Sequence, residues 1–150
     1  MASVAVQAAD FDPFQEGEAL LAGRGDVGAL VSFVGLCRDE GGRLAALEIE
    51  HYPGMAETEI GRVAATAEAR WPLLGLRVVH RFGRIGPGER IVMVAAAAAH
   101  RGDAFAAAGF LMDYLKAHAP FWKREHGADG TVGAWVDAKP SDDVAMARWG

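Results

Sequence analysis

The sequence contains a single cysteine, Cys37, among its 150 residues. One thiol cannot form a disulfide within the chain, and by itself it cannot build a zinc site. The five histidines show no spacing typical of metal ligands, and no cluster of carboxylates accompanies them. We therefore expect neither a disulfide nor a bound metal. A lone cysteine at the expected end of a strand is more often a small apolar filler than a reactive group.

Long hydrophobic runs are also missing. The stretch from Ile91 to Ala99 is among the longest, and it is far shorter than the roughly 20 residues that a helix needs to cross a bilayer. Near the N-terminus, Asp10, Asp12 and Glu16 stand where a secretion signal would need apolar residues. With 51% hydrophobic and 23% charged residues, the composition is typical of a soluble globular protein. We expect one domain, residues 1–150, located in the cytoplasm.

Positive charge is scarce in the first part of the chain. Residues 1–60 contain eleven acidic and three basic side chains, whereas residues 61–150 contain nine acidic and twelve basic ones, and the net charge is -5. Binding to nucleic acid depends on neutralising many phosphates, so an acidic chain without a basic stripe is not expected to bind it. A small anion is the better expectation for the basic part.

Lysine occurs only three times, against twelve arginines. Two of the three, Lys116 and Lys123, fall in the stretch 100–126, which also contains three histidines and two arginines. This concentration of basic groups predicts an anion site, and lysine is preferred where an amine must be able to lose its proton. A turn at Pro120 could bring both amines to one pocket. The alternative is that Lys116 is an ordinary solvated residue, favoured by the dipole at a helix C-terminus.

Strand and helix patterns alternate along the chain, with neighbouring strands between residues 76 and 99, and predict one α/β or α+β domain. In the first helix we expect an N-cap at Asp12 and an inward-facing Phe14, and in the third helix an N-cap at Asp103. Residues 27–35 are expected to form a central strand, and residues 83–88 a turn. Strands are expected at 4–7, 27–35, 44–52, 76–82, 91–99 and 131–136, and helices at 13–22, 55–71, 103–118 and from 141 onwards.

Two further sites could contact an anion. His100 and Arg101 lie where a buried strand leads into a helix, and free backbone N–H groups, the helix dipole and a guanidinium can together hold a phosphate. The alternative is that Arg101 pairs with Asp103 or a surface carboxylate and that His100 only caps the strand. Arg38 follows a strand in a glycine-containing loop, which is a frequent place for a residue that contacts substrate.

Several fragments, in this order and spacing, resemble the large, catalytic subunit of molybdopterin synthase, the MoaE family. The resemblance runs from about residue 10 to Trp149. The fragments are Phe33-Val34-Gly35 with Arg38-Asp39, then 47–55, 69–71, 80–83, 99–101, 104–105, 115–116 and 120–125.

The resemblance implies an α/β hammerhead fold with an added antiparallel β subdomain. It also implies a sulfurtransferase of molybdenum-cofactor biosynthesis, which converts cyclic pyranopterin monophosphate to molybdopterin by installing two dithiolene sulfurs. The sulfur would come from a small ubiquitin-like subunit whose C-terminal Gly-Gly carries a thiocarboxylate. A homodimer of large subunits with one small subunit at each end, a heterotetramer, is the implied assembly. No metal, cofactor, nucleic acid or membrane is expected to take part.

The resemblance also assigns residues to roles. We expect Lys123 to be the principal acid/base or covalent-intermediate amine and Lys116 to steer the thiocarboxylate tail. Cys37 would not carry the sulfur. The competing hypothesis is a non-catalytic module that binds a ubiquitin-like tail and a phosphorylated metabolite, and a third is an unrelated phosphate-binding transferase. The substrate-binding residues implied are Phe33, Arg38, His100, Arg101 and, from the neighbouring subunit, Lys139, where many relatives have arginine.

Overall fold

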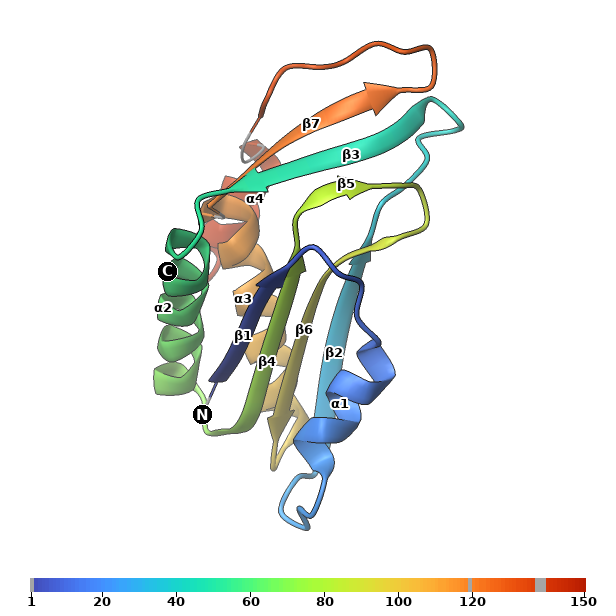
Figure 1. Ribbon diagram of the computed structural model, residues 1–150. Coiled ribbons are helices and arrows are strands. Elements are labelled where there is room, and N and C mark those ends of the chain that lie inside the picture. The colour runs from blue at the N-terminus through green and yellow to red at the C-terminus, as the bar shows by residue number, and fades with distance from the viewer. Residues whose placement is uncertain (1, 119, 137–139) are drawn as a thin grey trace.

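The computed structural model describes residues 2–118, 120–136 and 140–150, with the side chains of 140–143 left aside. Its larger sheet has four strands in the order β1-β4-β6-β2. β1 pairs with β4 in parallel, and the other pairs are antiparallel (Figure 1). The bounds are β1 Ala2–Gln7, β2 Ala29–Leu36, β4 Leu73–Arg81 and β6 Arg90–Ala98.

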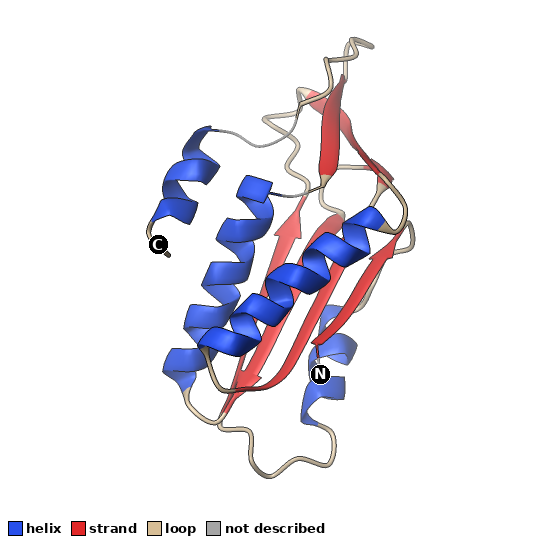
Figure 2. Cartoon of the chain, turned by 90° about the vertical axis from the view of Figure 1, so that its left-hand side faces the viewer, coloured by secondary structure: helices blue, strands red, loops and turns tan. Residues whose placement is uncertain are grey.

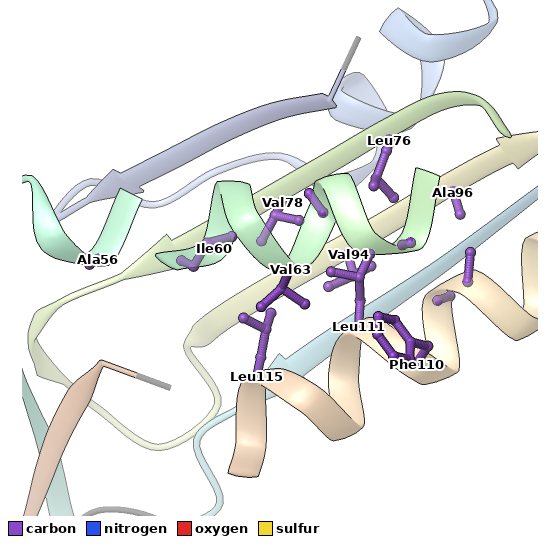
Figure 3. Close-up of a cluster of buried hydrophobic side chains, with 14 of the residues drawn as sticks. Ala56, Ile60, Val63, Leu76, Val78, Val94, Ala96, Phe110, Leu111 and Leu115 are labelled. Carbon is purple, nitrogen blue, oxygen red and sulfur yellow. The ribbon is translucent and has the colours of Figure 1, made fainter. Parts of the chain in front are cut away.

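Helices cover both faces of this sheet. α2 (Met55–Arg70) and α3 (Arg101–His118) lie side by side on one face, and α1 (Pro13–Leu21) lies on the other (Figure 2). The larger core fills the space under α2 and α3, where fully buried side chains such as Ile60, Leu76 and Leu111 meet (Figure 3). In β6, alternate alanines face the two sides, and these small side chains let the helices pack close to the sheet.

A second, three-stranded antiparallel sheet stands at one end of the first, in the order β5-β3-β7 (Figure 1). Its strands are β3 (Leu44–His51), β5 (Gly83–Ile85) and β7 (Phe121–Gly127). The last helix, α4 (Pro140–Ala147), packs against α3, and Trp149 donates a hydrogen bond from Nε1 to Asp113 over 2.7 Å. A mixed α/β fold with an added antiparallel sheet is confirmed. None of the helices in the described ranges is both long and apolar enough to cross a membrane.

Several local predictions are confirmed. Asp12 caps α1 by accepting hydrogen bonds from the backbone N–H groups of Phe14 and Gln15. α2 buries the apolar positions expected of it, and the alanine-rich segment is a buried strand. The C-terminal segment does form a helix, beginning at Pro140.

Other local predictions are wrong. The side chain of Phe14 is 82% exposed. The buried residue of α1 is Gly17, and a Cβ added there would lie 3.3 Å from the Leu30 side chain. β2 is an edge strand, paired only with β6 within the described sheet. α3 begins at Arg101, so Asp103 lies in its first turn and is not its N-cap.

The second sheet holds the remaining corrections. Residues 83–85, expected to be part of a turn, form β5 because they pair with β3. β7 was not expected as a strand, and it too pairs with β3. The strand expected at 131–136 is reduced to two isolated bridges, Lys123 with Val136 and His126 with Val132.

Candidate active site

A cavity of about 460 Å³ lies where the two sheets and the C-terminal end of α3 meet. Arg38, Lys116 and Lys123 are part of its wall, together with apolar side chains such as Met112 and Leu115 of α3. The cavity wall thus combines cationic groups with apolar side chains, an arrangement suited to a small anionic molecule with a flat ring. A cavity of this size is within the range of small-molecule sites.

The two lysines reach the cavity from different elements. Lys116 is in the last turn of α3, where the helix dipole favours a cation. The chain then reverses direction after His118, and Lys123 lies in β7 opposite Ile49 of β3. The seven-residue spacing therefore does not describe one helical face. It describes a helix end and a strand that fold over the same space.

Arg124, next to Lys123, is held firmly in the cavity wall. Its Nε donates to Glu48 over 2.8 Å, and its guanidinium lies 4.4 Å from the centre of the Trp135 ring. His126 also donates to Glu48, from Nε2 over 2.8 Å. These hydrogen bonds, from His126 first and then Arg124, hold the pKa of Glu48 below its usual range. Glu48 is therefore ionised near neutral pH. Arg38, in contrast, is largely exposed and lies 3.5 Å from Glu40.

His80 of β4 also lines the cavity, although it was not among the expected site residues. Its ring is stacked on Phe121 at 3.8 Å between centroids with an interplanar angle of 12°. The side chain is 5% exposed. Burial, together with the nearby charges of Lys123 and Lys116, lowers the pKa of His80 to about 3. His80 is thus a neutral imidazole beside two ammonium groups.

Cys37 lies in the cavity wall but has the character of a packing residue. It is 3% exposed, and its Sγ is 3.8 Å from the carbonyl oxygen of Ile85. Burial raises the pKa of the Cys37 thiol, so the reactive thiolate is disfavoured. Within the described ranges, no group of three or more histidine, cysteine, aspartate or glutamate residues could hold a metal ion.

Comparison with known proteins assigns the family. The model of the family described as "MoaE protein" matches residues 6–118. The chain belongs to the MoaE family. It is 64% identical to the "Molybdopterin synthase catalytic subunit" of Mesorhizobium japonicum, over 98% of this chain and 92% of that protein. Identity to the protein of the same name from Pseudomonas aeruginosa is 50%, over 98% of each chain.

Solved structures of MoaE proteins show the same fold. The MoaE protein of Burkholderia ambifaria superposes with a TM-score of 0.86 at 52% identity, covering 100% of this chain and 99% of that one. The molybdopterin synthase structure from Staphylococcus aureus gives a TM-score of 0.77 at 26% identity, covering 89% and 95% of the two chains. The match to the Burkholderia ambifaria protein extends over the whole chain and so includes the segments of the three-stranded sheet.

In this MoaE chain, the expected substrate-binding residues do not all meet. Arg38 lines the cavity with the two lysines. His100 and Arg101 are exposed at the other end of α3, and fifteen residues of helix separate Arg101 from Lys116 by roughly 22 Å. Among the described residues, Arg101 forms no ion pair with Asp103 or with another carboxylate, so the alternative that it pairs with one of these groups is not supported.

Two expected site residues remain. Phe33 lies on β2 opposite Val94, with 41% of its surface exposed, and it is not part of the cavity wall within the described residues. Lys139 lies outside the described residues. The roles of Phe33, His100, Arg101 and Lys139 therefore stay predictions.

Proposed function

We propose that this chain is the catalytic subunit of a molybdopterin synthase. It would transfer sulfur from the thiocarboxylated C-terminus of a small ubiquitin-like subunit to cyclic pyranopterin monophosphate. The cavity that holds Lys116, Lys123 and Arg38 together is the observation that carries this proposal. The relatives named molybdopterin synthase catalytic subunit, which match over nearly the whole chain, support it.

The chemistry requires what this cavity offers. In each transfer a carbon–sulfur bond forms on the pterin side chain while a carbon–oxygen bond at the same carbon breaks, and the displaced oxygen leaves as water or stays on the phosphate. The bond between sulfur and the terminal glycine carbonyl carbon of the small subunit breaks, and water converts that carbonyl to a carboxylate. Thiocarboxylate, phosphate and the tetrahedral oxyanion are all negatively charged, and fixed cations stabilise them more in a partly desolvated cavity than in water. Arg38 would hold the phosphate.

The two lysines would have different tasks. Lys123, beside the buried wall formed by Phe121 and His80, would transfer protons or form the covalent amine intermediate. Lys116, at the exposed end of α3, would guide the incoming thiocarboxylate tail. Cys37 would have no part in sulfur transfer because it is buried as a thiol.

A homodimer explains the distant residues. Because α3 separates His100 and Arg101 from the cavity of their own chain, we propose that they act at the cavity of the second large subunit, as expected for Lys139. With one small subunit bound at each end, the assembly would be a heterotetramer, acting in the cytoplasm.

The test is a single-turnover reaction with cyclic pyranopterin monophosphate and a thiocarboxylated small subunit. We expect dithiolene product from the native protein and loss of product from Lys123→Arg, because arginine keeps the charge but does not deprotonate. Arg43→Lys, a change at a largely exposed side chain outside this cavity, is the matched control. If the native protein binds the small subunit but forms no product, the chain is a binding module and the catalytic assignment is wrong.

A further inference from the structure

His80 has a fixed tautomer. Its Nδ1 is 2.8 Å from the backbone carbonyl oxygen of Arg81. A carbonyl oxygen can only accept a hydrogen bond, so Nδ1 carries the proton and donates it. In the neutral ring the other nitrogen, Nε2, therefore has a free lone pair and is an acceptor.

His80 is part of the cavity wall. Its hydrogen bond through Nδ1 leaves Nε2 as the ring nitrogen that can accept a further hydrogen bond. Within the described part of the chain, no buried side-chain nitrogen or oxygen lacks a partner. Nε2 is therefore either exposed to the cavity or bonded to a neighbouring group. The ring face is covered by Phe121, so the accessible part is an edge.

The side chains of Lys123 and Phe121 extend from the same face of β7. Alternate residues of a strand point to one face, so the residue two positions after Phe121 extends on the face where the His80 ring is stacked. The electrostatics agree, because Lys123 has the strongest influence on His80 of the charged side chains around it. The other groups that face His80 are Lys116 from α3 and His51 from β3.

We propose that His80 is a positioning residue for sulfur transfer, and that its Nε2 accepts a hydrogen bond from the ε-ammonium group of Lys123. This inference rests on the proposed function of the cavity. A neutral acceptor directs the ammonium group without cancelling its charge, whereas a carboxylate in the same place would form an ion pair and weaken its pull on the anionic substrate. Burial keeps the acceptor neutral throughout the physiological pH range.

The scarcity of lysine makes a direct test possible. With only three lysines, the chain labelled with ¹³C at the lysine ε-carbons gives three side-chain NMR signals, which Lys→Arg variants assign. The pKa of Lys123 is then measured in the native protein, in His80→Phe, which keeps a ring against Phe121 but has no acceptor, and in His80→Gln, which has a side-chain acceptor.

An acceptor favours the charged amine, so its loss in His80→Phe should lower the pKa of Lys123 by about half a unit to one unit. His80→Gln should restore at least half of this change. In single turnover, His80→Phe should be slowed about tenfold with less than a twofold change in substrate affinity.

The outcomes separate this inference from the proposed function. An equal Lys123 pKa in all three proteins overturns the role of His80, whether or not the native protein makes product. So does an equal fall of that pKa in both variants, because His80 would then act through packing alone. If His80→Phe does not fold, His80→Leu replaces it in the same measurement. Absence of product from the native protein refutes the proposed function and leaves the NMR result to decide on His80.

Discussion

The buried imidazole of His80 should make the stability of this protein depend on pH between 7 and 5. The pKa of His80 is about 3 in the folded chain, against an ordinary value of 6.5. Below pH 6.5 the unfolded chain therefore binds a proton that the folded chain does not. The free energy of unfolding therefore decreases as the pH falls from 6.5 towards 3, and below pH 3 it decreases no further through His80.

The size of the effect follows from these two pKa values. Between pH 7 and pH 5 the free energy of unfolding should fall by roughly 2 kcal/mol through His80 alone. The side chain is 5% exposed, so solvent screening does not reduce this figure much. Carboxyl groups whose pKa is lowered in the folded chain, such as Glu48, contribute mainly at lower pH.

The assay is urea unfolding followed by circular dichroism at pH 7 and pH 5. One protein concentration is used throughout, because the stability of an oligomer depends on concentration. His80→Phe has no group to protonate at this position, so its fall should be smaller than that of the native protein by roughly 2 kcal/mol. An equal decrease in the free energy of unfolding of the two proteins would show that His80 is not held neutral by burial.

Three further predictions concern other parts of the molecule. Cys37→Ala should keep most of the single-turnover activity, and loss of sulfur transfer by a folded variant would contradict the buried-thiol argument. Leu111→Ala should lower the free energy of unfolding by about 2 to 5 kcal/mol in urea titration, because the side chain is fully buried under α2; a loss below about 1 kcal/mol would contradict the packing described. Mixed dimers of Lys123→Ala with Arg101→Ala chains should regain activity at one of their two cavities, whereas neither variant alone is active. No recovery in the mixture would show that Arg101 does not act across the dimer.

The sequence predicts well those elements whose pattern comes from burial along one face. α2 repeats its apolar residues at helical spacing, and the β6 segment is apolar throughout because both of its faces are covered. Phe14 misled the interpretation of α1, since an aromatic side chain next to an N-cap is also compatible with the exposed face. β2 was misassigned because an apolar run does not tell whether a strand has one neighbour or two.

β7 could not be predicted from local pattern. Its sequence from Phe121 has three charged residues in a row and no alternating pattern, and it becomes a strand because β3 supplies backbone partners from 70 or more residues away. Long sequence separation is also the reason why the site could not be predicted in full. The stack of His80 on Phe121 joins residues 41 positions apart, and nothing in either local sequence points to the other. The basic stretch 100–126 did indicate the two lysines correctly as neighbours, since a short reversal joins them.

The separation of His100 and Arg101 from Lys116 could have been calculated from the sequence. A helix expected from 103 to 118 already has a fixed rise per residue, and its length places the two ends far apart. Resemblance placed these residues in one site, and helix geometry shows that one chain cannot do so. The resemblance and the helix geometry agree if His100 and Arg101 act at the cavity of a second copy of the chain.

The parallel pairing of β1 with β4 affects how the chain reaches its fold. β1 is the first strand to leave the ribosome, yet the strand that it pairs with begins at Leu73. Until β4 has been made and has found β6, β1 has no backbone partners, and the edge of β4 that it will cover is open to other chains. Closing a loop of about 70 residues is slow compared with forming the adjacent β4–β6 pair. The first strand synthesised is therefore expected to be among the last to take its place, and the nascent protein is most prone to aggregate during that interval.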